Sequence, residues 1–296
     1  MYCYKIYGLV IESEIEFPEA FELEEQPADV VVRYGMMPEN IRKEKEELHH
    51  TFKQNQSLKW FYFEEEGSFL IENGTSICVE PDATADEKHI RALVLGACLG
   101  TILLQRERIA IHGSAVVWRN KAIILSGRSG TGKSTICTEL RNRGCLFLAD
   151  DTVAITSEAD VLYANPAYPQ QKLCTDAAAA FGYQLQDLIL LNEEKMKYAI
   201  RLKDSFCPDR KVIAALVILE IREDYQLIVQ ELRGSEKLEY IIKNLYSNVD
   251  YRYIGMNTKV FRKCMEFAQK VPIIRIARPA GLNTVETIVD QLISKL

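Results

Sequence analysis

The segment Gly127–Thr135, with the sequence GRSGTGKST, constrains the fold of this chain more than any other part of it. It matches the pattern G-x-x-x-x-G-K-[ST], the apolar run Lys121–Leu125 precedes it, and a helical pattern follows to about Asn142. Glycines in such a loop let backbone N–H groups converge on phosphate oxygens, and the helix N-terminus attracts negative charge. In this motif Lys133 reaches the β- and γ-phosphates and the Ser134 hydroxyl ligates Mg²⁺. We therefore predict a nucleoside-triphosphate site formed by Gly127, Arg128, Ser129, Gly130, Thr131, Gly132, Lys133, Ser134 and Thr135.

Two carboxylates, Asp150 and Asp151, follow the apolar run Cys145–Ala149 and stand 17 and 18 residues after Lys133. A helix of about ten residues followed by an adjacent parallel strand would return them to the side of the phosphate loop. One carboxylate there can hold Mg²⁺, and the other can accept a proton from an attacking hydroxyl. The alternative is an Asp pair that caps a turn. The position after the carboxyl end of a strand favours the functional interpretation.

Other candidate residues have weaker signals. His112 lies 21 residues before Lys133, at the end of a strand entering a hairpin that can fold it toward the phosphates. A lone histidine is more often structural than catalytic. Basic residues further along could neutralise charge in a transition state, although most such residues are merely solvated. The candidates for that role are Lys172, Lys197, Arg201 and Arg210.

Composition excludes several classes of protein. With 36 Lys+Arg against 42 Asp+Glu, the net charge of −6 argues against a nucleic-acid partner. The longest apolar stretch, Ala92–Leu104, is 13 residues, too short to span a membrane, and the N-terminus does not resemble a signal peptide. Eight scattered cysteines without a Cys-x-x-Cys pair indicate reduced thiols in a cytoplasmic protein rather than a zinc site.

The pattern of apolar residues predicts three parts and an α/β fold. Residues 1–82 read as a small antiparallel β region, with a hairpin turn at Asn73-Gly74. Residues 83–107 read as a buried connecting helix that begins at a capping box, Thr84 to Glu87. Residues 108–296 read as the phosphate-loop domain, a mixed sheet flanked by helices, with the apolar run Val212–Leu219 as a strand covered on both faces.

Three stretches resemble the catalytic core of HPr kinase/phosphorylase, which shares its nucleotide-binding fold with phosphoenolpyruvate carboxykinase: residues 112–114 (HGS), residues 126–134 (SGRSGTGKS) and residues 139–151, which include ELRNRG and ADD. The resemblance covers about 40 residues closely and the rest of the domain more loosely. It implies that ATP and Mg²⁺ are the cofactors. It also implies that Lys133 binds phosphate, that Ser134 and Asp150 hold the metal, and that Asp151 accepts the proton of a substrate serine with His112 in the site.

The chain also departs from that family. A Glu-Ile-Arg-Gly-type stretch, which supplies a metal-binding Glu in the bifunctional enzymes, is replaced by Asn165–Asp176, where Asp176 could stand in. The opening Tyr4-x-x-Tyr7-Gly8-Leu9 and the late Arg278-Pro279 are more similar to HPr-kinase-related proteins of peptide natural-product pathways. Some of those, in lasso-peptide pathways, phosphorylate a serine of the precursor peptide. The missing Glu-Ile-Arg-Gly-type signature implies a kinase without efficient phosphorolysis.

Three functions stay open at this point. The first is a kinase that phosphorylates a serine of a protein or precursor peptide. The second is a kinase for a small hydroxyl metabolite, such as free serine or a sugar-like compound, since shikimate- and gluconate-kinase-like enzymes also place an Asp at a similar interval. The third is a nucleotide-dependent protein that binds a peptide, for example by adding it as a strand to the N-terminal β region, without transferring phosphate. A homo-oligomer is compatible with each of them.

Overall fold

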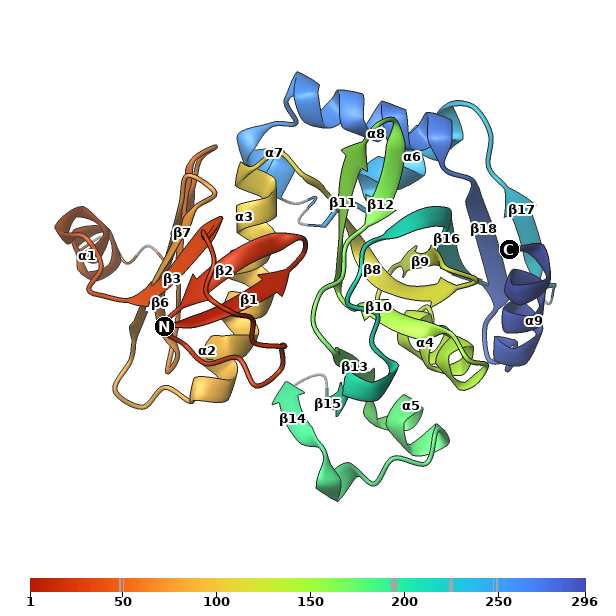
Figure 1. The fold of residues 1–296 in the computed structure, drawn as a ribbon, viewed down its shortest axis with the longest axis horizontal. Helices are drawn as coiled ribbons and strands as arrows, with labels where there is room; N and C mark the ends of the chain where they lie inside the picture. The colour runs from red at the N-terminus through yellow and green to blue at the C-terminus, as the bar shows by residue number, and fades with distance from the viewer. Residues whose placement is uncertain (48, 50, 193–195, 224–225, 247, 249) are drawn as a thin grey trace. The chain divides into compact units, whose positions relative to one another are not determined.

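The structure is a computed structural model that describes residues 1–296 except 48, 50, 193–195, 224–225, 247 and 249. It divides into two compact units, which are coloured along the chain in Figure 1. The first comprises Met1–Arg108 and Ser247–Asn257, and the second comprises Ile109–Tyr246 and Thr258–Leu296. Residues 83–107 and the late segment 247–257 therefore both count toward the first unit.

The first unit is built on a seven-stranded sheet in the order β1-β2-β3-β7-β6-β5-β4. Pairs β2·β3 and β3·β7 are parallel, whereas the other four pairs are antiparallel as predicted, so the region differs from the prediction at β3. The reason is that β3 is reached through a long connection rather than a tight turn. The hairpin at Asn73-Gly74 is confirmed, with φ of 55° at Asn73 and 67° at Gly74. The strands are β1 (Tyr2–Ile6), β2 (Leu9–Ser13), β3 (Val30–Tyr34), β4 (Phe52–Gln54), β5 (Leu58–Phe63), β6 (Gly67–Glu72) and β7 (Ser76–Pro81), and the helix α1 (Glu39–Glu46) follows β3.

A run of helix packs against this sheet. It consists of α2 (Glu87–Leu93), the π-helical turn Val94–Cys98 and α3 (Leu99–Gln105), and α3 is buried along its first six residues. The side chain of Asp86 caps α2 by accepting a hydrogen bond of 2.9 Å from the Lys88 N–H. The predicted capping box is therefore wrong, because Asp86 stands directly before the first helical turn and satisfies its backbone donor itself. The helix α7 (Asp250–Ile254) adds an ion pair of 3.0 Å between Asp250 and Lys59 of β5.

The second unit contains the predicted mixed α/β fold. Its main sheet runs β10-β8-β11-β12-β16-β18-β17, and β9 lies between β8 and β16. The pairs β9·β16 and β16·β18 are parallel and the others are antiparallel. A small second sheet has the order β13-β15-β14. The strands are β8 (Ile109–Trp118), β9 (Lys121–Gly127), β10 (Leu146–Ala149), β11 (Thr152–Glu158), β12 (Val161–Ala164), β13 (Gln170–Cys174), β14 (Ile189–Asn192), β15 (Lys197–Arg201), β16 (Lys211–Arg222), β17 (Ile228–Glu231) and β18 (Ile273–Pro279).

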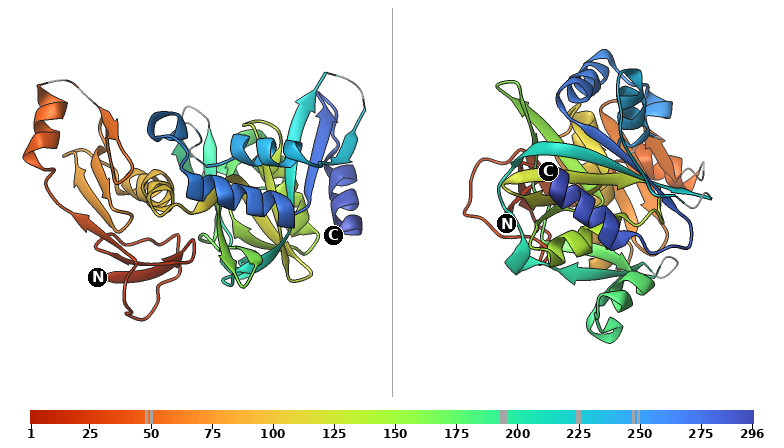
Figure 2. Two further views of the ribbon diagram at one scale, coloured as in Figure 1. Left: turned by 90° about the horizontal axis from the view of Figure 1, so that it is seen from above. Right: turned by 90° about the vertical axis from the view of Figure 1, so that its right-hand side faces the viewer.

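Helices cover both faces of the main sheet, as the right-hand view of Figure 2 shows. The pair α4 (Lys133–Asn142) and α9 (Val285–Lys295) packs on one face, and its buried residues share a hydrophobic core with β9, β16 and β18. The pair α6 (Ser235–Lys243) and α8 (Thr258–Lys270) lies on the other face. The short helix α5 (Thr175–Ala180) follows β13. Within the described part of the chain, no helix is both long and apolar enough to cross a membrane.

Candidate active site

The strand β8 organises the site. Along one edge, its residues 109–112 pair with β11 and its residues 115–117 pair with β10. Only Asp150 and Asp151 lie between these two strands, so the register places them opposite Gly113 and Ser114 of β8. The Gly113 N–H donates to the Asp151 carbonyl oxygen over 3.2 Å. The strands β10 and β11 thus form one antiparallel ladder with β8, and the two aspartates interrupt it. The flanking strands fix the aspartate pair to β8.

The other edge of β8 pairs with β9, the strand that leads into the phosphate loop. The prediction that the strand before the aspartates is an adjacent parallel neighbour of β9 is therefore wrong, because β8 lies between them. Both β9 and β10 are antiparallel to β8, so they run in the same direction and end at the same edge of the sheet. That shared edge is why the aspartates still come close to the loop.

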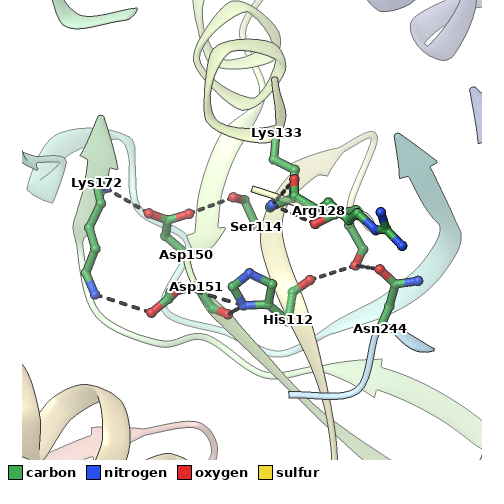
Figure 3. A network of polar contacts seen from close by, with 10 residues as sticks. His112, Ser114, Arg128, Lys133, Asp150, Asp151, Lys172 and Asn244 are labelled. Carbon is green, nitrogen blue, oxygen red and sulfur yellow. Dashed lines mark hydrogen bonds and ion pairs between the residues drawn. The ribbon is translucent and has the colours of Figure 1, made fainter. Parts of the chain in front are cut away.

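Asp150 is held inside the protein. Its residue is 8% exposed, and Oδ1 accepts a hydrogen bond of 2.6 Å from Ser114 Oγ while Oδ2 accepts one of 2.8 Å from the Lys172 N–H (Figure 3). Burial raises the pKa of Asp150, and these two hydrogen bonds oppose that rise without cancelling it. The Asp150 side chain is thus fixed in orientation and costly to ionise.

Asp151 has a different environment. Its Oδ2 lies 3.3 Å from Lys172 Nζ and its Oδ1 lies 3.7 Å from His112 Nδ1 (Figure 3). Burial alone would raise the pKa of Asp151, but the charges of Lys172 and His112 outweigh it and bring the pKa below the ordinary carboxyl range. The His112 Nδ1 atom also lies 3.0 Å from the Asp151 carbonyl oxygen, which only accepts, so Nδ1 carries a hydrogen. The backbone of Asp151 is left-handed, with φ of 66°.

The phosphate loop has the conformation that its glycines require. Gly132 precedes α4 with φ of 97°, and Gly127 has φ of 139°. A Cβ atom on Gly127 would lie 2.3 Å from the Leu219 carbonyl oxygen, so no other residue fits there. The ammonium of Lys133 donates to the Gly127 carbonyl over 2.7 Å, and burial lowers its pKa. Lys133 therefore lies folded over the loop, and its ammonium would have to leave the Gly127 carbonyl oxygen to reach a bound phosphate.

These elements surround a cavity of about 550 Å³. Twelve of the predicted site residues line it, namely His112, Ser129, Gly130, Gly132, Lys133, Ser134, Thr135, Asp150, Asp151, Lys172, Asp176 and Lys197. The other five predicted site residues, Gly127, Arg128, Thr131, Arg201 and Arg210, do not line it. Arg210 instead pairs with Glu158 and stacks 4.5 Å from the centre of the Tyr163 ring. Lining residues that the sequence analysis did not single out for the site include Cys174, Ala177, Ala180 and Asn283.

The oxygen donors in this cavity suit Mg²⁺. The Ser134 hydroxyl and the carboxylates of Asp150 and Asp151 are hard ligands of the kind that Mg²⁺ prefers. The described residues contain no group of three or more His, Cys, Asp or Glu side chains that could hold a metal ion. Magnesium in phosphoryl-transfer sites is bound through one or two carboxylates together with the phosphates, so no such cluster is required.

Three supporting residues were not predicted as site residues. The fully buried Gln171 donates to the Ser134 carbonyl over 3.0 Å, which ties β13 to the first turn of α4. The Asn244 carbonyl accepts from the His112 N–H over 2.8 Å, and Asn244 Oδ1 lies 3.0 Å from Ser126 Oγ (Figure 3). Arg278 donates to the Thr131 carbonyl over 2.9 Å. Gln171 and Asn244 belong to no motif, whereas the place of Arg278 near the carboxyl end of a parallel strand is a usable signal.

Comparisons with known proteins identify similar kinases. No family model matches the chain. An HPr kinase/phosphorylase from Exiguobacterium sp. strain AT1b is 24% identical over 238 residues, which cover 74% of each protein. The HPr kinase/phosphorylase of Lacticaseibacillus casei strain BL23 is 30% identical over 123 residues, or 38% of each protein. The predicted resemblance to HPr kinase/phosphorylase is confirmed. These relatives indicate an enzyme of the phosphotransferase class, as predicted.

Among solved structures, the HPr(Ser) kinase/phosphatase from Coxiella burnetii aligns with 63% of this chain and 89% of its own, with 12% sequence identity and a TM-score of 0.33. A TM-score this low supports no inference about fold or function. The mixed α/β fold is established by the sheet order and the helices of the second unit themselves.

Proposed function

We propose that this chain is an ATP- and Mg²⁺-dependent kinase that transfers the γ-phosphoryl group of ATP to a serine hydroxyl of a protein or precursor peptide in the cytoplasm. One observation carries the proposal. Asp151, whose pKa is held below the ordinary carboxyl range, lines the same cavity as Lys133 and Ser134 of the phosphate loop. A cavity that brings together a phosphate loop and a deprotonated carboxylate suits transfer of a phosphoryl group to a hydroxyl.

Different residues of the cavity have different roles in this reaction. The loop residues 127–135 hold the triphosphate, with Lys133 on the β- and γ-phosphates. Ser134 and Asp150 would hold Mg²⁺, which bridges phosphate oxygens and neutralises their charge. Asp151 accepts the proton of the attacking serine hydroxyl, and Lys172 and His112 keep its carboxylate ionised and oriented.

The environments of the two aspartates support this assignment of roles. Two carboxyl groups whose surroundings shift their pKa values in opposite directions perform different tasks in many active sites. Asp150 is buried and held by two hydrogen bonds, which suits a fixed metal ligand. The Asp151 side chain is 33% exposed, so a substrate hydroxyl can reach it.

The experiment is a search for the acceptor. The protein is incubated with γ-labelled ATP, Mg²⁺ and serine-containing peptides, including small peptides encoded beside its gene, and products are read by mass spectrometry. Free serine and sugar-like metabolites form a parallel set. We expect a gain of one phosphate on a peptide serine. Transfer only to a metabolite would mean that the acceptor is a small molecule and not a peptide. ATP binding without any ADP formation would contradict the proposal that the protein is a kinase.

A further inference from the structure

Two lysines share the face of the small sheet that borders the cavity. In the β13·β15 ladder Lys172 pairs with Ala199, and Cys174 pairs with Lys197. Directly paired residues of antiparallel strands point to the same face, and diagonal partners lie about 7–8 Å apart. Lys172 and Lys197 are such a diagonal pair, and both line the cavity together with Cys174.

The two ammonium groups are not equivalent. Lys172 Nζ lies 3.3 Å from Asp151, and the backbone N–H of the same residue donates to Asp150. The ammonium of Lys197 has no hydrogen bond or ion pair to any residue in the described part of the chain. Its charge is nevertheless close enough to lower the pKa of both Lys133 and Asp151. The ammonium of Lys197 therefore lies near both Lys133 and Asp151 but forms no hydrogen bond or ion pair with either.

The other basic candidates do not offer such a charge. Arg201 pairs in register with Gln170 at the far end of the same ladder, is exposed, and does not line the cavity. Arg210 is engaged by Glu158 and by the Tyr163 ring. The phosphoryl-transfer transition state spreads charge over three equatorial oxygens, which a suitably placed cation stabilises.

We propose that Lys197 is a further catalytic residue, whose ammonium binds the transferring phosphoryl group and neutralises the charge on its equatorial oxygens. This inference rests on the proposed kinase function. In that step a bond forms between the acceptor oxygen and the γ-phosphorus, and the bond from the γ-phosphorus to the β,γ-bridging oxygen breaks. The electron pair of the broken bond stays with ADP, and the acceptor proton passes to Asp151. Lys197 forms no covalent bond.

The test compares Lys197→Met, Lys197→Arg and the wild type. Removing a transition-state cation lowers kcat by about 10²-fold or more, because comparable cations in phosphoryl-transfer enzymes contribute 10³ or greater. We expect Lys197→Met to show that loss with less than about a fivefold change in ATP affinity, and Lys197→Arg to recover part of kcat. Lys243→Met is the matched control, since Lys243 is 61% exposed on α6 and does not line the cavity, and it should retain full activity.

A second readout needs no acceptor. ADP with aluminium fluoride mimics the transferring phosphoryl group, so the wild type should bind this combination more tightly than ADP alone, and Lys197→Met should lose most of that gain. The role of Lys197 is refuted if the wild type transfers phosphate and binds ADP more tightly in the presence of aluminium fluoride, and Lys197→Met does both equally well. If the wild type does neither, the kinase proposal itself fails.

Discussion

The Ser114 hydroxyl donates a 2.6 Å hydrogen bond to Asp150. That bond anchors a carboxylate whose neighbour in the chain, Asp151, is paired instead with Lys172 and His112. Two consecutive aspartates thereby receive opposite pKa shifts, upward for Asp150 and downward for Asp151. Both side chains line the cavity, and the difference comes from their partners: Asp150 is buried against Ser114 and the Lys172 N–H, whereas Asp151 lies beside two basic side chains.

The first prediction concerns stability. Because burial raises the pKa of Asp150, the folded protein holds that proton more tightly than the unfolded chain, so ionisation destabilises the fold as pH rises through the raised pKa. Asparagine is neutral throughout and can accept from the Lys172 N–H and donate to Ser114. We expect Asp150→Asn to exceed the wild-type Tm at pH 8 by roughly 2–4 °C, and the difference to shrink toward pH 4. Calorimetry at both values checks this, and a wild type that is the more stable protein at pH 8 would refute it.

The pH dependence of activity tests the pairing of Lys172 with Asp151. Lys172→Met removes the ammonium while the carboxylate stays partly buried, so the pKa of Asp151 rises. We expect the acid limb of the kcat/KM profile to move to higher pH. Lys172→Arg should keep the limb near its wild-type position, because it retains the charge. An acid limb that does not move in Lys172→Met would mean that another group than Asp151 controls it.

The sequence predicted the phosphate loop, the aspartate pair and the cavity-lining lysines, because local motifs and the order of strands determine where they lie. It did not predict that β8 lies between β9 and β10, since antiparallel partners far apart in sequence leave no local pattern. Gln171 and Asn244 were missed for the same reason: their roles come from single hydrogen bonds made by tertiary packing. Arg210 failed as a site candidate because Glu158 and Tyr163 engage it elsewhere.

Gly113 should tolerate no side chain. A Cβ atom there would lie 2.1 Å from the Leu125 carbonyl oxygen, a backbone atom that cannot move without breaking the β8·β9 ladder. We expect Gly113→Ala to lower the free energy of unfolding by about 3 kcal/mol or to prevent folding. Gly96→Ala is the control, because at that helical position no atom of the described residues lies within 4 Å of a new Cβ, so the change should be neutral or stabilising. Thermal unfolding of both variants decides, and equal stability would contradict the close approach.

Gln171 should position the phosphate loop. Its Nε2 donates to the Ser134 carbonyl, and its Oε1 accepts from Arg141 over 2.9 Å. Gln171→Met keeps the volume but leaves these buried groups without this partner, which costs about 2 kcal/mol of stability. We also expect weaker ATP binding, because Ser134 lies in the first turn of α4, the helix that follows the phosphate loop. Urea unfolding and nucleotide titration measure the two effects, with the exposed Gln186→Met as control; wild-type values for both would exclude this role.

The most direct test of the account compares ATP binding with phosphoryl transfer in Asp151→Asn. Asp160→Asn is a close control, because Asp160 also has a left-handed backbone, with φ of 64°, and pairs with a lysine, Lys270, at the surface. The account predicts that Asp151→Asn binds ATP with an affinity within a few-fold of the wild type and loses transfer by about 10³-fold or more, while Asp160→Asn retains both. Wild-type transfer by Asp151→Asn, or an equal loss of binding and transfer, would contradict the role of Asp151 as the proton acceptor.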